Sequence, residues 1–144
     1  MKQHKVERRV MWGDLDSLGI VFYPRYYEWI DACGHLFFDS IGLNQGALWR
    51  ERDIIFGLAE TSCRHLLPAR YHQKILILTH IQALETKTVL LSHRIRDAET
   101  DALLVKGLEK RICLDVSNPD RLTAIRIPED IYKRLAEAGT AEEP

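Results

Sequence analysis

The chain has 144 residues, of which 46% are hydrophobic and 28% are charged, and its formal net charge is −1. This composition is typical of one globular domain and excludes a disordered chain, and no apolar run is long enough to span a membrane or to form a signal-peptide core. A net charge near zero gives no general attraction to nucleic acid, so we expect one cytoplasmic domain over residues 1–144 that binds neither membrane nor nucleic acid.

The first element expected along the chain is a short strand over residues 5–11, and the second is a long amphipathic helix. Pro24 fits the first helical position, because its φ is fixed and its missing N–H would have no partner there. Apolar residues follow at three- and four-residue spacing as far as Ile41, and Gly42 predicts the end of the helix. This helix is the longest in the chain.

A short helical turn is expected over residues 44–52, and after it the residue composition becomes typical of strands. Four segments rich in β-branched and aliphatic residues follow, at 54–67, 74–85, 87–97 and 102–115. The breaks between them are too short for crossover helices, so the sheet should be antiparallel. An extended piece over 121–127, a second helix over 128–138 and a frayed tail over 139–144 complete the chain. The pattern predicts an α+β domain whose sheet wraps the long helix.

The loop before the long helix carries the candidate chemistry. Backbone N–H groups at residues 23–26 would be free and would lie at the positive end of the helix dipole, where a negative charge is favoured. Asp16 lies just upstream, across a loop that Gly19 allows to bend. Its carboxylate could attack an acyl carbonyl, or activate water, while the N–H groups hold the carbonyl oxygen. Spacing alone favours the alternative that Asp14, Asp16 and Ser17 are turn or capping residues.

Residues 13–26 are similar to the signature of the 4-hydroxybenzoyl-CoA thioesterase branch of the hotdog-fold superfamily. The shared features are an acidic residue, one spacer, an aspartate, two residues, a glycine, a short apolar run and Tyr-Pro-x-Tyr opening the helix. The likeness continues through residues 29–32 and, more weakly, to residues 127–128. It implies a hotdog fold, in which one antiparallel sheet wraps the central helix. It also implies an acyl-CoA hydrolase that acts on an aromatic or medium-sized acyl group.

The resemblance assigns roles to three residues near the helix start. Asp16 would be the catalytic nucleophile or the general base, and the Tyr23 backbone N–H would polarise the thioester carbonyl. Asp31 would lie near the acyl pocket, and, apart from the resemblance, the aromatic residues Trp29, Tyr26, Phe37 and Trp49 could line that pocket. Against this, a charged helical stripe usually faces water, and aromatic residues at helical spacing are usually plain core.

Coenzyme A carries phosphates, which need lysine or arginine at the rim of the site. The resembling family draws such residues from the segment entering its penultimate strands and from the basic stretch before its last helix. Those places hold Lys87 and Arg121 here, with Arg126 as a further candidate. Thr123 stands where some relatives have a second arginine. For each cation the alternative is a solvated surface residue.

No metal or other cofactor is expected. The six histidines fall in different elements without ligand spacing, and the three cysteines form no Cys-x-x-Cys pair. Cys63 and His65 share one face of a predicted strand, which raises the possibility of a cysteine nucleophile assisted by histidine. Nothing nearby in the sequence activates the thiol, so core packing is the favoured interpretation.

An unpaired sheet edge on so small a domain favours assembly. The resemblance implies a homodimer with a continuous sheet and sites at the subunit interface, and a homotetramer of two such dimers. Two other functions remain open. A dehydratase or hydratase on this fold usually has a histidine near the helix start, where this chain has Ile20. A non-catalytic acyl-CoA binding protein would share the fold without turnover.

Overall fold

The computed structural model describes residues 1–142 of the chain. Its elements are β1 (His4–Arg9), a 3₁₀ turn η1 (Trp12–Asp14), α1 (Pro24–Ser40), α2 (Gln45–Arg52), β2 (Ile54–His65), β3 (Lys74–Leu84), β4 (Thr88–Asp97), β5 (Leu103–Asp115), β6 (Thr123–Ala124) and α3 (Glu129–Ala138). Each predicted helix and strand is present with small shifts at its ends, except that the extended piece expected over residues 121–127 is a strand only at Thr123–Ala124. The last two residues of the predicted tail lie outside the described residues. No helix within residues 1–142 is both long and apolar enough to cross a bilayer.

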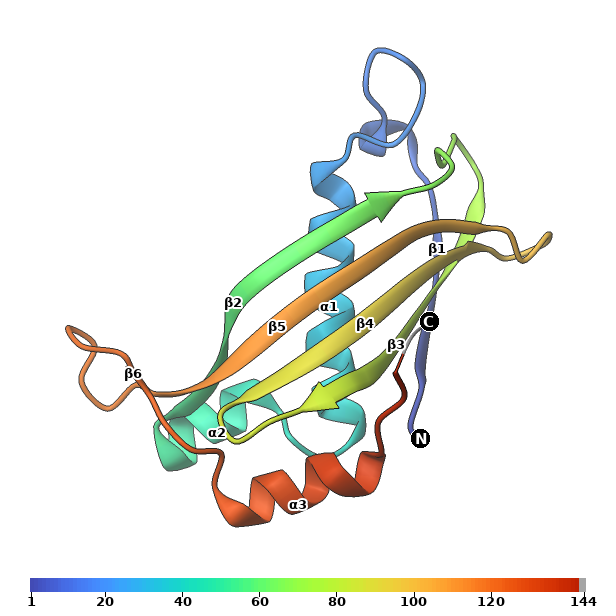
Figure 1. Ribbon diagram of the computed structural model, residues 1–144. Helices are drawn as coiled ribbons and strands as arrows, with labels where there is room; N and C mark the ends of the chain where they lie inside the picture. The colour runs from blue at the N-terminus through green and yellow to red at the C-terminus, as the bar shows by residue number, and fades with distance from the viewer. Residues whose placement is uncertain (143–144) are drawn as a thin grey trace.

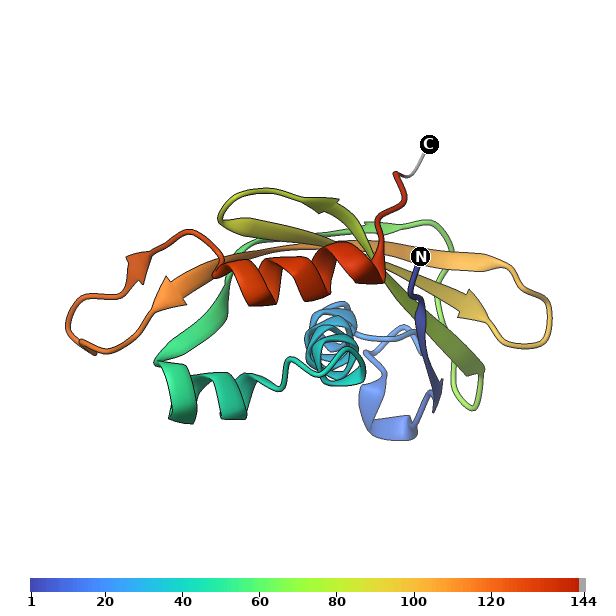
Figure 2. The ribbon, with the colours of Figure 1, turned by 90° about the horizontal axis from the view of Figure 1, so that it is seen from below.

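The six strands form one antiparallel sheet in the order β1-β3-β4-β5-β2, with β6 added to the end of β5. The sheet curves, and α1 runs along its concave face, as the end-on view in Figure 2 shows. Within residues 1–142 no helix covers the other face of the sheet, and α2 and α3 lie at the end of the molecule opposite the loop that precedes α1 (Figure 1). The predicted α+β arrangement, one sheet wrapped around a long helix, is confirmed.

The core explains why α1 is held so firmly against the sheet. One cluster of buried side chains packs the first half of the helix, through Tyr26 and Ile30, against β1, β3 and β4. A second cluster packs the other half, through Phe37 and Phe38, against α2, α3 and the far end of the sheet. Burying one such side chain stabilises a protein by about 1.5–3 kcal/mol, so this stripe fixes the start of the helix in space.

Candidate active site

The loop before α1 folds back on itself as a narrow hairpin. Leu15 and Val21 form an antiparallel bridge, and the Asp16 N–H donates to the Ile20 carbonyl at 2.8 Å. Gly19 adopts a φ of 76°, and its N–H donates to the Asp16 carbonyl at 3.0 Å. A residue with a side chain would be strained there, so glycine makes the tight reversal possible. Asp16 therefore lies near the tip of a hydrogen-bonded hairpin.

Asp14 braces the base of this hairpin. Its carbonyl accepts the Phe22 N–H at 2.8 Å, and its carboxylate accepts the Met11 N–H at 2.9 Å. The same carboxylate is buried, 3.8 Å from Arg8 Nη2 on β1 and 3.9 Å from Arg25 Nε on α1. The side chain thus ties the loop both to the sheet and to the first turn of the helix. Asp14 is a structural residue of the loop, which fits the turn interpretation for this aspartate.

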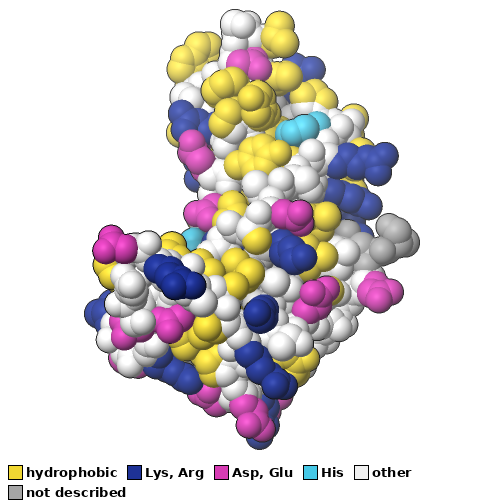
Figure 3. Space-filling model, turned by 60° about the vertical axis from the view of Figure 1, so that its left-hand side comes forward, with side chains coloured by type: hydrophobic (Ala, Val, Ile, Leu, Met, Phe, Trp, Pro, Cys, Tyr) yellow, Lys and Arg dark blue, Asp and Glu magenta, His cyan; other side chains and the backbone are white. Residues whose placement is uncertain are grey.

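Asp16 opens onto a cavity of about 400 Å³ beside the start of α1. The cavity is lined by Asp16, Tyr23, Tyr26 and His65 and by the apolar residues 20–21 and 66–68. Asp16 Oδ1 accepts the Leu18 N–H at 2.8 Å, and Oδ2 has no hydrogen-bond partner among the described residues. The carboxylate is therefore held in place with one oxygen available. Hydrophobic side chains gather at this end of the molecule, at the top of Figure 3.

The backbone at the helix start leaves one N–H available. The Arg25 N–H donates to the Phe22 carbonyl at 2.9 Å, the Tyr26 N–H donates to the Tyr23 carbonyl at 3.1 Å, and Pro24 has no N–H. The free N–H groups expected over residues 23–26 are thus reduced to that of Tyr23, which donates no hydrogen bond within residues 1–142. An unpaired N–H at a helix N-terminus beside a carboxylate can hold the oxygen of a reacting carbonyl.

Tyr26 and His65 are further side chains that line the cavity. The Tyr26 hydroxyl accepts the Ala69 N–H at 3.2 Å, and burial raises the pKa of Tyr26. The His65 ring lies 5.4 Å from the Tyr26 ring, centroid to centroid. Sequence reasoning missed His65 as a site residue, because no local spacing links the end of a strand to a loop far upstream. Its only signal was its place on one strand face with Cys63.

Cys63 does not have the character of a nucleophile. Its side chain packs beside Tyr27 against the core, and burial raises the pKa of the thiol to about 11. The thiolate is the reactive form of cysteine, and it is scarce at neutral pH when the pKa is this high. The structure therefore supports the core-packing interpretation of this residue.

Asp31 lies outside the cavity and pairs with a buried arginine. Its Oδ1 accepts from Arg111 Nη2 at 2.6 Å and lies 3.5 Å from His35 Nε2, while 51% of its side chain remains exposed. Trp29 is only 6% exposed and packs edge-to-face on Tyr26, with the Arg8 guanidinium 4.7 Å from its ring centroid. The roles of Asp31 and Trp29 toward substrate remain predictions.

Arg111 belongs to a polar network under α1 that sequence reasoning also missed. Thr79 Oγ1 and His93 Nδ1 are 2.8 Å apart, His93 Nε2 and Glu109 Oε1 are 2.8 Å apart, and Arg111 Nη2 donates to Glu109 Oε2 at 2.8 Å. All four residues are buried. Gly34 makes room for them, since a Cβ at that position would lie 2.6 Å from Glu109 Oε1. The glycine within the helix was the one local sign of this network.

Lys87 lies far from Asp16 within one chain. β3 starts beside the loop that carries Asp16, because the Val10 N–H donates to the Gln73 carbonyl at 2.9 Å, and Lys87 follows the other end of β3. A strand of this length spans roughly 30 Å. Figure 1 shows the two regions at opposite ends of the molecule.

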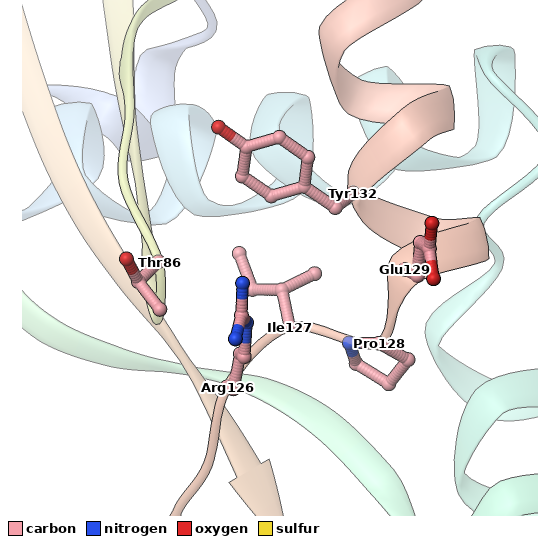
Figure 4. A pocket seen from close by; sticks show the side chains of 6 residues that line it. All are labelled: Thr86, Arg126, Ile127, Pro128, Glu129 and Tyr132. Atoms are coloured by element: carbon pink, nitrogen blue, oxygen red, sulfur yellow. The ribbon is translucent and has the colours of Figure 1, made fainter.

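A cavity of about 630 Å³ adjoins the turn between β3 and β4. Figure 4 shows Thr86, Arg126 and Tyr132 on its walls. Lys87 lines a neighbouring cavity that shares Thr86 and Tyr132. The fold thus brings Lys87 and Arg126 together, whereas Arg121 lies on the loop between β5 and β6, outside these walls.

No group of three or more histidine, cysteine, aspartate or glutamate side chains suited to a metal ion occurs within residues 1–142.

Comparison with known proteins gives a consistent set of relatives. The family model described as the thioesterase superfamily matches residues 18–103. A 4-hydroxybenzoyl-CoA thioesterase from Pseudomonas sp. (strain CBS-3) is 28% identical over 132 residues, which cover 87% of this chain and 92% of that protein. The acyl-CoA thioesterase YbgC of Haemophilus influenzae is 19% identical over 123 residues, which cover 85% of this chain and 87% of that protein.

Solved structures of thioesterases also superpose on this chain. A gentisyl-coenzyme A thioesterase superposes with a TM-score of 0.77 at 29% identity, over 92% of this chain and 99% of that chain. An aspartate-to-asparagine mutant of 4-hydroxybenzoyl-CoA thioesterase, complexed with 4-hydroxybenzoyl-CoA, superposes with a TM-score of 0.84 at 26% identity, over 94% and 99% of the two chains. The predicted hotdog fold is confirmed.

Proposed function

The chain belongs to the thioesterase superfamily, and we propose that it hydrolyses an aromatic acyl-CoA to the free acid and coenzyme A. The observation that supports this most directly is the cavity that holds the Asp16 carboxylate and the unpaired Tyr23 N–H together at a helix start. Relatives of known structure act on 4-hydroxybenzoyl-CoA and gentisyl-CoA, both of which carry an aromatic acyl group. The apolar lining of the cavity suits such a group.

In this proposal the thioester carbonyl oxygen accepts a hydrogen bond from the Tyr23 N–H. Asp16 either attacks the carbonyl carbon or takes a proton from the attacking water. The N–H stabilises the oxyanion that forms, an effect worth about 10²–10³-fold in kcat for a single well-placed donor. Coenzyme A leaves as a thiolate, which is a good leaving group and needs no strong general acid.

The test is thiol release from a panel of aromatic, short-chain and long-chain acyl-CoAs. We expect Asp16→Asn to lower kcat by at least about 100-fold, because the amide can neither act as a base nor form a hydrolysable anhydride. Asp101→Asn is the matched control, since Asp101 lies on an exposed turn with a φ of 62°, a conformation that asparagine tolerates. Equal rates in wild type and Asp16→Asn would contradict the assignment of Asp16. No turnover by the wild type would favour a binding protein.

We further propose that Lys87 and Arg121, with Arg126 beside Lys87, bind the phosphates of coenzyme A. Lys87 and Asp16 lie at opposite ends of the folded subunit. An acyl-CoA molecule that contacts both residues would therefore contact Asp16 of one subunit and Lys87 of another. Asp31 is proposed to contact the acyl group with the exposed half of its side chain. Trp29, which packs against the cavity residue Tyr26, is proposed to contact the acyl group beside that ring.

Lys87→Gln and Arg121→Gln should each raise the KM for acyl-CoA by about tenfold, the loss of one hydrogen bond from a charged group. The same variants should leave the KM unchanged for the matching acyl-pantetheine, which lacks the nucleotide phosphates. Lys5→Gln, on the distant edge strand β1, is the control. A parallel rise in KM for both substrates would argue against phosphate binding.

The assembly proposed here is a homodimer formed along β2, with a homotetramer of two such dimers. β2 is a long edge strand, Leu67 is an exposed apolar residue that lines the cavity, and Trp12 and Phe22 are exposed apolar residues of the segment that leads to α1. Both features favour contact with another subunit. Cytoplasmic location and a single domain over residues 1–144 complete the proposal.

A dehydratase or hydratase reaction is the alternative. Such enzymes usually have a histidine near the helix start; the sequence has Ile20 there, but His65 lines the same cavity. Such an enzyme would change the acyl chain without releasing thiol. Product analysis of the same assay by mass spectrometry separates the two reactions.

A further inference from the structure

We propose that His65 is a second catalytic residue of this cavity, and that it takes the proton from the water that hydrolyses an acyl group carried on Asp16. The inference rests on the proposed thioesterase function and deepens it. It also chooses between the two roles open to Asp16, because it makes the carboxylate a nucleophile.

The first step of the argument is position. His65 is the last residue of β2, and its side chain points to the side of the sheet on which α1 lies, where its ring meets that of Tyr26. It lines the same cavity as Asp16 and Tyr23. A substrate carbonyl held at the Tyr23 N–H would therefore share this cavity with both the carboxylate and the imidazole.

The second step is availability. The His65 ring takes part in no hydrogen bond or ion pair within residues 1–142, and the residue is exposed to the cavity. Other histidines of the chain are engaged elsewhere: both ring nitrogens of His93 are bonded in the core, and His35 lies 3.5 Å from Asp31. A nitrogen of His65 is thus free to bind water or substrate.

The third step excludes the other titratable side chains that line the cavity. A carboxylate that has bonded to the acyl carbon cannot also act as the base for water. The Tyr26 hydroxyl already accepts the Ala69 N–H, and burial raises its pKa. Tyr23 serves the proposed reaction through its backbone N–H, which holds the carbonyl oxygen. Imidazole is the side chain suited to this transfer near neutral pH.

The chemistry then balances in two steps. Asp16 forms a bond to the acyl carbon, the carbon–sulfur bond breaks, and its electron pair leaves with the coenzyme A thiolate. Water next attacks the acyl carbon of the anhydride while His65 accepts one of its protons, and the bond to Asp16 breaks to restore the carboxylate. His65 finally gives the proton to the thiolate or to solvent. The sum is thioester plus water giving acid plus thiol.

The test is rapid-mixing thiol release from excess 4-hydroxybenzoyl-CoA with wild type, His65→Gln and His65→Ala. Glutamine keeps the bulk and polarity of the side chain without its basicity, and alanine removes both. In each variant we expect a burst of about one thiol per site, followed by a steady rate lowered by about 10²–10⁴-fold. Acid quenching should then trap the acyl group on the peptide that contains Asp16.

His72→Asn is the matched control, because His72 is another exposed histidine at this end of the molecule and asparagine tolerates its φ of 65°. It should behave as wild type. Unfolding midpoints of all variants check that the fold is intact. Three results for His65→Gln would overturn this inference and leave the proposed function standing: wild-type progress curves, a slower reaction without a burst, or a change in KM only. A wild-type protein that releases no thiol would overturn the proposed function and this inference with it.

Discussion

Two side chains near the end of β2 show how burial separates reactive from unreactive groups. Cys63 and His65 lie on the same face of the strand, two residues apart. Cys63 packs beside Tyr27 against the core, and its thiol is held protonated by burial. His65 projects past the edge of that packing into the cavity. Residue type and spacing alone would suggest that the pair works together, whereas the depth of each side chain assigns only His65 to the chemistry.

The raised pKa of Cys63 predicts a pH dependence of stability. Its thiol has a pKa of about 11 in the folded chain against 9.0 when unperturbed, so the folded state holds the proton more tightly. The resulting stabilisation is present below pH 9 and is lost as pH rises toward 11. We expect the free energy of unfolding, measured by urea titration, to fall less steeply over this window in Cys63→Ala. The variant should also keep the wild-type kcat, and a large loss of kcat would restore the cysteine to the mechanism.

At the scale of one element, α1 meets two separate structural requirements, one at its N-terminus and one at its middle. In the proposed mechanism its N-terminus presents the Tyr23 N–H to the cavity, while its middle passes over the buried carboxylate of Glu109. Gly34 meets the second requirement by leaving space for a side chain that is already bonded to His93 and Arg111. The helix can therefore lie close to the sheet, which keeps its first turn in register with the hairpin that holds Asp16.

Gly34→Ala should destabilise the protein, although the same change in an ordinary helix stabilises it by about 0.5–1 kcal/mol. A Cβ would lie 2.6 Å from Glu109 Oε1 and 3.4 Å from Leu91 Cδ1, so the buried carboxylate must move away from its partners. We expect a loss of about 1–3 kcal/mol in the free energy of unfolding, measured by chemical denaturation. Ala32→Gly, on the exposed side of the same helix, reports helix propensity alone. A stabilised Gly34→Ala protein would refute this account of the glycine.

At the scale of the whole molecule, one chain holds the proposed catalytic residues far from the residues proposed to bind phosphate. The carboxylate and the helix start lie at one end of the sheet, and Lys87 and Arg126 lie at the other. The edge strand β2 runs the length between them, and nothing is paired with its outer side within residues 1–142. A second copy along this edge would place further side chains beside the cavity.

The assembly proposal predicts that a charge on this edge weakens the oligomer. Ala59 is exposed at the irregularity in the pairing of β2 with β5, so Ala59→Lys adds a charge without disturbing a paired position. We expect it to raise the dissociation constant of the dimer at least about tenfold, measured by light scattering over a dilution series, and kcat to fall as the dimer dissociates. Ala136→Lys on the exposed face of α3 is the control. A wild type that remains monomeric at all concentrations would contradict the proposal.

The sequence by itself determined the elements and their order, because these depend on local signals. Pro24 and Gly42 mark the ends of the long helix, the aliphatic segments are the strands, and the short breaks between them require antiparallel pairing. The same local signals, read with a family signature, singled out Asp16 and Tyr23, since both belong to one continuous stretch of chain. The cavity confirms only that these two residues lie together; their catalytic roles remain a prediction.

Only the tertiary structure decided which distant residues join that stretch. His65 reaches the cavity because β2 ends beside α1, and Glu109 and Arg111 meet Gly34 because β5 passes under the helix. The fold also places Lys87 and Arg126 together at the far end of the sheet from Asp16. The physical reason is that such contacts depend on strand register and on how a curved sheet wraps a helix. Neither the strand register nor the curvature of the sheet produces a recognisable pattern of residues in the sequence.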